Sequence, residues 1–293
     1  MKKIVVIGSI NVDLVVSSER FPKKGETIIG NSFNVFCGGK GANQAVSASK
    51  LGGHVEFIGA VGDDSYGDLA LNNLKDHGVG ISSVAKLNGI STGLASITVA
   101  ENDNQIVIIK GANEKINIEF IKQYLEVIQE ASMVVLQFEI PLETVFYLVD
   151  YCYEHGIKTI LNPAPFVPFD KTIIDKVTYF TPNETEINAM FDESYEEVLC
   201  KYPNKIIMTK GSEGAFMHDG NQLVHIHPKK VNVVDTTGAG DTFNGALAAF
   251  IAQEINLVDA LEKANIAAGI SIGKIGAQSA MPTLDEVEQY EEA

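Results

Sequence analysis

Apolar and polar positions along the chain follow two different rhythms. Short apolar runs rich in β-branched residues indicate buried strands, and longer segments with apolar residues every three or four positions indicate helices. The predicted strands are residues 3–8, 54–61, 133–137, 158–161, 177–181 and 205–209. The predicted helices are residues 43–51, 67–77, 118–131, 142–155, 184–191, 241–253 and 257–273. This alternation is typical of an α/β fold with a mainly parallel sheet between layers of helices.

Two stretches depart from this pattern, because predicted strands follow one another there without a helix between them. Residues 12–16 and 26–36 form the first pair, and residues 93–100 and 105–110 form the second, joined by a turn at 101–104. A helix-free β element inserted twice into an α/β chain predicts a small sheet that packs beside the main one as a lid.

The chain shows no internal repeat, low-complexity tract or linker that would divide it. Its 293 residues exceed a typical domain but lie within the range of one large α/β unit with an accessory element. We therefore expect a single domain over residues 1–293, with lid strands inserted at about 12–36 and 93–110.

The balance of charges limits the partners that the protein can have. The formal net charge is −16, whereas nucleic acid and anionic membranes attract basic surfaces. We expect neither as a partner. Arg20 is the only arginine, so any phosphate group would have to be bound by lysine, backbone N–H groups and metal ions.

The cysteines and the start of the chain favour a cytoplasmic protein. Cys37, Cys152 and Cys200 lack C-x-x-C spacing and are typical of reduced thiols. The first apolar run ends at Gly8, which indicates a buried strand rather than a signal peptide. No apolar run approaches the length that a membrane span requires.

The segment richest in chemical information covers residues 234–246 and reads Val-Asp-Thr-Thr-Gly-Ala-Gly-Asp-Thr-Phe-Asn-Gly-Ala. Its small residues Gly238, Ala239 and Gly240 let backbone N–H groups converge, and the dipole of the following helix adds attraction for an anion. This predicts a phosphate site without a Walker lysine. Asp241 has a simpler interpretation as a helix cap. A cap alone would not require the Gly-Ala-Gly run, which favours a functional role.

A second glycine-rich segment, Gly-Gly-Lys-Gly-Ala-Asn-Gln-Ala at residues 38–45, leads from a predicted lid strand into a helix. By itself it fits a simple turn with a polar helix cap as well as a binding site. Asn11, Asp13 and Glu139 follow predicted strands, at the edge where open α/β sheets bind ligands. Their carboxylates and amide suit the hydroxyl groups of a polyol.

These segments resemble the C-terminal and N-terminal signatures of the ribokinase family of carbohydrate kinases, and the resemblance extends over nearly the whole chain. It implies a ribokinase-like three-layer α/β/α fold with a lid, and ATP-dependent phosphorylation of D-ribose at O5 in ribose catabolism. Asp241 would be the catalytic base, and Gly238, Ala239 and Gly240 would form the anion hole. An aspartate of ordinary basicity suffices, because phosphoryl transfer has a loose transition state.

The resemblance also implies the ligand contacts. The implied sugar-binding residues are Asn11, Val12, Asp13, Gly39, Lys40, Gly41, Ala42, Asn43, Glu139 and Asp241. The implied ATP-binding residues are Asn183, Thr209, Lys210, Gly211, Ser212, Glu213, Gly214, Gly240 and Asn265. For the loop at residues 209–214 and for Asn265, a simple turn and a polar helix residue stay open as alternatives.

Two metal ions are implied as well. Asn183 and Glu186 would help to place Mg²⁺, largely through water, although their spacing also fits a capped helix and both interpretations can hold together. A monovalent cation, K⁺, would be bound mostly by backbone carbonyl groups. The residues implied around it are Asp235, Thr237, Ser271, Lys274, Gly276 and Ala280. Because backbone atoms are the ligands, side-chain identity is a weak test of this site.

Some other functions lack their motifs in this sequence, and others remain compatible with it. The chain lacks the G-x-G-x-x-G of dinucleotide-binding enzymes and the Walker motif of P-loop enzymes. A kinase for deoxyribose or another sugar, and a non-catalytic sugar-binding protein on the same fold, stay open. His225 and His227 alternate as metal ligands would, but without a third ligand a solvated strand face is favoured.

A second subunit could cover the edges of the lid sheet, so we expect a homodimer through the lid.

Overall fold

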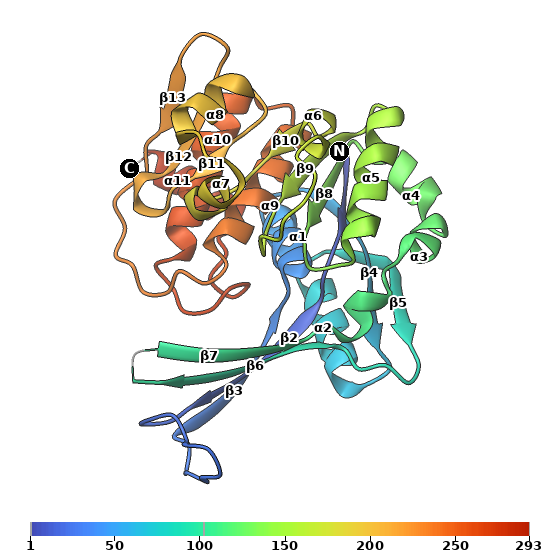
Figure 1. Cartoon of the computed structure of the whole chain (residues 1–293), viewed down its shortest axis with the longest axis vertical. Coiled ribbons are helices and arrows are strands. Elements are labelled where there is room, and N and C mark those ends of the chain that lie inside the picture. The colour runs from blue at the N-terminus through green and yellow to red at the C-terminus, as the bar shows by residue number, and fades with distance from the viewer. Residues whose placement is uncertain (1, 102, 293) are drawn as a thin grey trace.

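The computed structural model describes residues 2–101 and 103–292. Its centre is a six-stranded sheet in the order β10-β9-β8-β1-β4-β5, in which every neighbouring pair is parallel (Figure 1). The strands are β1 (Lys3–Ile7), β4 (His54–Gly62), β5 (Gly80–Leu87), β8 (Met133–Gln137), β9 (Lys158–Asn162) and β10 (Tyr179–Phe180).

Helices cover both faces of this sheet, because alternate residues of a strand point to opposite faces. In β1, Ile4 and Val6 belong to one buried core, and Val5 and Ile7 belong to the other. The first core is enclosed by α1 (Lys40–Lys50), α2 (Ser65–Asp76), α9 (Ala239–Ala252), α10 (Leu257–Ser271) and α11 (Leu284–Glu292). The second is enclosed by α3 (Ile118–Lys122), α4 (Leu125–Gln129), α5 (Leu142–Glu154), α6 (Ile173–Lys176), α7 (Glu184–Met190) and α8 (Tyr195–Lys201). The predicted three-layer fold is confirmed.

The lid is a separate four-stranded sheet that projects from the body at the bottom of Figure 1. Its order is β3-β2-β6-β7, with β2 and β6 parallel and the two outer pairs antiparallel. The strands are β2 (Asn11–Ser17), β3 (Ser32–Gly38), β6 (Gly93–Ala100) and β7 (Asp103–Ile109). The predicted small lid sheet is confirmed, although β3 begins later than predicted. The turn predicted at 101–104 includes residue 102, which lies outside the described residues.

A third sheet extends the central one beyond β10. Strands β11 (Met208–Thr209), β12 (Ala215–His218) and β13 (Leu223–Ile226) pair in that order, all antiparallel. Single parallel bridges join Phe180 to Ile206 and Asn183 to Thr209, so this small sheet continues the edge of the central one. Short 3₁₀ helices, η1 (Gly111–Lys115) and η2 (Gly211–Glu213), lie in the connections.

One predicted helix is wrong in extent. Residues 118–131 form two short helices, α3 and α4, because the chain tightens between them: the N–H groups of Gln123 and Tyr124 bond to carbonyls three residues back.

Within the described residues, no helix is long and apolar enough to cross a membrane.

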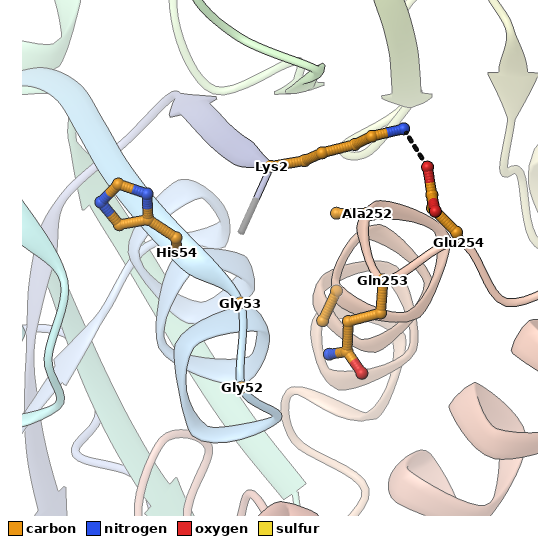
Figure 2. A pocket seen from close by; sticks show the side chains of 8 residues that line it. Lys2, Gly52, Gly53, His54, Ala252, Gln253 and Glu254 are labelled. Atoms are coloured by element: carbon orange, nitrogen blue, oxygen red, sulfur yellow. Dashed lines mark ion pairs between the residues drawn. The ribbon is translucent and has the colours of Figure 1, made fainter.

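The two ends of the central sheet differ in what surrounds them. At the amino ends of β1 and β4, a 470 Å³ cavity is lined by Lys2, His54 and Gln253 among others, and Lys2 Nζ pairs with a Glu254 oxygen at 2.7 Å (Figure 2). None of the predicted site residues lines that cavity. The carboxyl ends of β1 and β8 instead lead into the segments that carry the predicted sugar-binding residues, so the candidate site lies at that edge.

Candidate active site

Asp241 lies in the first turn of α9 and is only 7% exposed. Asn43 Nδ2 donates a hydrogen bond to its Oδ2 at 2.9 Å, and Gln44 Nε2 donates to its Oδ1 at 3.0 Å. Both donors belong to α1, which packs directly against α9. The N-cap of α9 is Gly238, without a side-chain cap. The interpretation of Asp241 as a simple helix cap is therefore wrong.

The turn before Asp241 needs glycine for physical reasons. Gly238 has φ of 75°, in the left-handed region, and a Cβ there would lie 2.9 Å from the Cβ of Ala277. A Cβ on Gly240 would meet no atom within 4 Å. The backbone at Gly240 is thus open, as close approach of a ligand to the N-terminus of a helix requires.

A cavity of 220 Å³ lies beside this turn. Its lining residues are Lys40, Asn162, Ala164, Asn183, Glu186, Thr209, Thr236, Gly238, Ala239, Gly240, Asp241 and Asn244. The structure therefore brings together the predicted base, the predicted anion hole, the motif lysine and the two predicted Mg²⁺ residues. The N-terminus of α9 at this cavity has a positive partial charge, which would attract an anion.

Lys40 supplies a positive charge to the same cavity. The Asp241 carboxylate raises the pKa of Lys40 most, burial opposes this, and Glu139 and Glu186 add to the increase. Lys40 therefore stays protonated at neutral pH, surrounded by carboxylates. A phosphate group that enters the cavity meets this cation as well as the backbone N–H groups.

Glu139 and Asp13 form the sugar end of the predicted site. Glu139 Oε2 accepts hydrogen bonds from the backbone N–H of Lys40 at 2.9 Å and from Ser9 Oγ at 2.5 Å. Burial, with a smaller contribution from the Glu139 charge, raises the pKa of Asp13 to about 6. Gly39 has φ of 90°, and a Cβ there would lie 2.8 Å from the backbone nitrogen of Asn11. These residues lie where the lid joins the body.

Asn113 is a residue of this region that sequence reasoning missed. Its Nδ2 donates to Asn11 Oδ1 at 2.8 Å and to the carbonyl of Ile10 at 3.1 Å, and its Oδ1 accepts from the N–H of Ile10 at 2.9 Å. It is 2% exposed. The available signal was an asparagine directly after Gly111 and Ala112, where the second lid hairpin returns to the body. Asn113 orients Asn11.

Four of the predicted sugar-binding residues, Gly39 among them, direct no side chain into the site. Val12 and Ala42 are buried in the first core, and Gly41 packs so closely that a Cβ would lie 2.6 Å from the backbone nitrogen of Ser9. They can contribute backbone atoms only. The side chain of Asn43 reaches Asp241, and its amide bonds to Asp241 and to Gln278.

A larger cavity of 720 Å³ adjoins the first and shares Thr236 and Ala239 with it. Its other lining residues are Gly211, Ser212, Pro228, Lys229, Lys230, Val231, Asn232, Val233, Asn265, Ala268, Gly269 and Ile272. The predicted nucleotide residues Gly211, Ser212 and Asn265 thus lie around one cavity. The part of the wall formed by residues 228–233 was missed, although Val231 and Val233, between a strand and the glycine-rich turn, were a usable signal.

The other residues of the predicted nucleotide loop do not line this larger cavity, and contacts elsewhere fix their positions. Lys210 Nζ forms ion pairs with Glu184 at 3.2 Å and with Glu213 at 3.3 Å. Gly214 has φ of 88° and is packed against the carbonyl of Ile226. Thr209 lines the smaller cavity, so the loop spans both.

Asn183 and Glu186 form a capping box at the start of α7, as the helix interpretation predicted. Asn183 Oδ1 accepts from the N–H of Glu186, and Glu186 Oε2 accepts from the N–H of Asn183, both at 2.8 Å. Glu186 is 6% exposed, and burial raises its pKa although the bond from Asn183 opposes this. Within residues 2–101 and 103–292, no group of three or more His, Cys, Asp or Glu side chains could hold a metal ion.

Asp235 links the two segments of the predicted K⁺ site. Its Oδ1 accepts from the N–H and hydroxyl of Thr237, and its Oδ2 accepts from the N–H of Gly276 at 2.9 Å. Burial favours a higher pKa for Asp235, but these bonds outweigh it and hold the pKa below its usual value. The Lys274 ammonium pairs with Glu286, and the Ser271 hydroxyl donates to the carbonyl of Ala268.

The His225 and His227 pair has a local structural role. The two rings lie 3.8 Å apart, His225 stacks on Phe216 at 4.1 Å, and its Nε2 donates to the carbonyl of Glu213 at 2.6 Å. These contacts fix the hairpin of β12 and β13 beside the predicted nucleotide loop.

Comparison with known proteins agrees with this geometry. A family profile described as "pfkB family carbohydrate kinase" matches residues 1–284. The chain belongs to the pfkB family of carbohydrate kinases. It is 47% identical to the ribokinase of Bacillus subtilis (strain 168) over 290 residues, which cover 99% of each chain. It is 38% identical to the deoxyribokinase of Salmonella typhi, with 98% of each chain covered.

A solved pfkB-family structure is close to this one along its whole length. The ribokinase of Arabidopsis thaliana, complexed with ribose and ATP, superposes with a TM-score of 0.91 at 32% sequence identity, and 98% of each chain is covered. This pfkB-family chain is therefore a carbohydrate kinase with small-molecule substrates, and its overall fold matches that of the relative.

Proposed function

We propose that the protein transfers the γ-phosphoryl group of ATP to O5 of D-ribose. The observation that carries this proposal is the 220 Å³ cavity, where Asp241, the open glycine turn and Lys40 meet at the carboxyl edge of the sheet. The similarity to ribokinases at up to 47% identity over nearly the full chain supports the choice of sugar.

The reaction follows from the positions of these groups. Ribose would lie between Asn11, Asp13 and Glu139 at the base of the lid, with its primary hydroxyl directed at Asp241. As that oxygen attacks the γ-phosphorus, the bond from phosphorus to the β–γ bridging oxygen breaks, ADP leaves, and the proton of the hydroxyl passes to Asp241. Lys40 and the N–H groups of the Gly238–Gly240 turn stabilise the negative charge on the phosphoryl oxygens.

ATP would occupy the two adjoining cavities. The larger, mainly apolar one suits the adenine and ribose of the nucleotide, and the smaller one suits the phosphates. Glu186 and Asn183 fit Mg²⁺, because this ion commonly takes one or two protein carboxylates, with phosphates and water completing its shell. Bound Mg²⁺ would neutralise charge on the phosphates.

We also propose a K⁺ site between the loop of Asp235 and Thr237 and the segment of Ser271, Lys274, Gly276 and Ala280. Asp235 supports it, because its carboxylate ties Thr237 to Gly276 directly behind the glycine turn. Potassium should then raise kcat several-fold over a buffer with only a bulky organic cation. Equal rates in the two buffers would remove the proposal.

The choice between ribose and deoxyribose needs a direct test, because a deoxyribokinase is also among the relatives. The purified protein should be assayed with ATP, Mg²⁺ and each sugar. We expect kcat/KM for ribose to exceed that for 2-deoxyribose at least tenfold, since a site built to bind a hydroxyl discriminates against its absence. A preference for deoxyribose would change the substrate, and absence of turnover with any sugar would favour a binding protein.

The lid has an exposed apolar surface that supports a homodimer. Ile106, Val107, Ile108 and Ile109 of β7 are each at least 50% exposed and point alternately to the two faces of the lid. Phe33 of β3, 59% exposed, lies on the same face as Val107, which gives that face a shared apolar surface. We propose that a second copy covers this surface and that the lids close over bound sugar. Val107→Lys should give a monomer in analytical ultracentrifugation, and hydrogen exchange in β2 and β6 should slow when ribose binds. A dimer that persists in Val107→Lys would contradict the proposed dimer interface. Unchanged hydrogen exchange would contradict closure of the lid.

We further propose a cytoplasmic location, where ATP is available.

A further inference from the structure

A connected set of mostly buried side-chain amides lies behind Asp241. It forms two arms, and each arm ends on one carboxylate oxygen. In the first arm, Gln137 Nε2 donates to Gln44 Oε1 at 2.7 Å, and Gln44 Nε2 donates to Asp241 Oδ1 at 3.0 Å. Gln44 Nε2 also reaches Asn162 Oδ1 at 3.3 Å. Gln44 and Gln137 are fully buried.

The second arm approaches from the opposite side. Asn73 Nδ2 donates to Gln278 Oε1 at 2.5 Å, and Gln278 Nε2 donates to Asn43 Oδ1 at 2.9 Å. Asn43 Nδ2 then donates to Asp241 Oδ2 at 2.9 Å. Gln278 is 4% exposed and lies in the segment after α10, far from α1 in the sequence.

Both arms have the same polarity. In each, the oxygen of an inner amide accepts a hydrogen bond from the next amide outward, so its NH₂ group must face inward to the carboxylate. If Gln44 turned over, its carbonyl oxygen would face the Asp241 carboxylate, and two amide nitrogens would face each other. Successive hydrogen bonds of one polarity strengthen one another in a buried setting. The carboxylate and the outer amides therefore favour the same orientation of the inner amides.

We propose that Gln44 and Gln278 are positioning residues for phosphoryl transfer, which hold the Asp241 carboxylate in one orientation from both sides. The proposal rests on the proposed function of Asp241 as the base. Neither glutamine lines the 220 Å³ cavity, so each acts through Asp241 or Asn43 rather than on the substrate. Fixing both oxygens leaves the carboxylate no free rotation, and the remaining lone pairs can then be aimed at the sugar hydroxyl.

The first test replaces Gln44 with leucine, which has a similar size but no donor. We expect kcat to fall by about ten- to a hundredfold, the scale of a misplaced reacting group, while the ribose Kd measured by calorimetry changes less than about threefold. The solvent deuterium isotope effect on kcat should also increase, because proton transfer becomes more nearly rate-limiting. A proportional loss of kcat and folded fraction, with an unchanged isotope effect, would overturn the role of Gln44.

The second test reverses the polarity of the other arm and does not depend on Gln44→Leu being folded. Gln278→Met only removes the donor, and we expect a loss in kcat of about three- to tenfold. Gln278→Glu introduces a carboxylate that attracts the NH₂ of Asn43 away from Asp241. This variant should lose more than Gln278→Met at pH 8 and recover as the pH falls and the introduced carboxyl group is protonated. Equal loss in the two variants at every pH would overturn the role of Gln278.

Gln253→Leu is the matched control. Gln253 follows α9, and its Nε2 donates to the carbonyl of Leu51 at 2.9 Å, at the opposite end of the sheet from Asp241. Its kcat should equal that of the wild-type protein. If ribose fails as a substrate but another sugar is phosphorylated, the same variants are compared with that sugar, so failure of the substrate and failure of the amide arms remain distinguishable.

Discussion

Two carboxylates in this site, the buried Asp241 and the partly buried Asp13, have opposite surroundings. Asp241, in the body, receives amide N–H donors on both oxygens. Asp13, at the base of the lid, receives no hydrogen bond from any side chain or backbone group within the described residues, and it lies near the charge of Glu139. The first carboxylate is complete before any ligand binds. The second carries the cost of burial without compensation, which sugar hydroxyl groups would relieve.

Among the variants of these two carboxylates, Asp241→Asn should have the largest effect on kcat. The variant keeps the size of the side chain but removes the proton acceptor, so kcat should fall by roughly 10²–10⁴-fold. Ribose binding, measured by calorimetry, should change little, because Asn11, Asp13 and Glu139 are intact. A nearly normal kcat would show that Asp241 is not the base, whatever happens to the melting temperature.

Gly240→Ala separates stability from function in the same region. A Cβ at this position meets no atom within 4 Å, and alanine is the better helix former, so the free energy of unfolding should rise by about 0.5–1 kcal/mol. The added methyl group would occupy the place proposed for the phosphoryl oxygens, and kcat/KM for ATP should fall by about ten- to a hundredfold. Ser65→Ala, at the exposed start of α2, should give the stability gain alone.

Asp13→Asn should raise the free energy of unfolding although it weakens the binding of ribose. Because burial raises the pKa of Asp13 from 3.8 to about 6, its charged form destabilises the folded protein above pH 6. The variant should therefore unfold with a free energy about 1–3 kcal/mol higher at pH 8, while the KM for ribose rises about tenfold. If stability does not increase, Asp13 is better solvated than its burial implies.

The pH dependence follows from the same shift. As the pH falls through about 6, Asp13 gains a proton in the folded state, while the unfolded chain binds it only near 3.8. The cost of the buried charge is thus present above pH 6 and relieved between pH 6 and 3.8. Ribose affinity should weaken several-fold as the pH is lowered from 7.5 to 5.5, and calorimetry should show a smaller change for Asp13→Asn. Identical profiles would assign the pH effect to another group.

The sequence predicted best the buried strand β8 and the lid strand β6, whose hydrophobic patterns are strong. The predicted bounds of β8 and β6 match the structure, because a continuous apolar or strictly alternating run leaves little freedom. Strand β5 was missed, since it lies at the edge of the sheet and carries Ser82 and Ser83, which bond to Glu56. An edge strand needs less apolar surface, so its pattern is weaker.

The site was predicted in a similarly uneven way. Asp241 and Lys40 were each identified from a motif within a single short segment, and the structure brings the two residues to one cavity. Asn113 and Gln278 were not assigned roles, because their partners are 102 and 235 positions away in the sequence. A polar residue whose function is to orient another carries no local motif, and only the fold brings the pair together.

The long separations in the amide arms also concern the order of events during folding. The bond from Asn43 to Asp241 joins residues 198 positions apart, and the bond from Gln278 to Asn43 joins residues 235 positions apart. Contacts of such high contact order form late, after local helices and neighbouring strands. A chain emerging from the ribosome therefore has most of its parallel sheet before residue 278 can orient the base. Until then the nascent protein has an incomplete catalytic centre, and recovery of activity should be the slowest step in refolding.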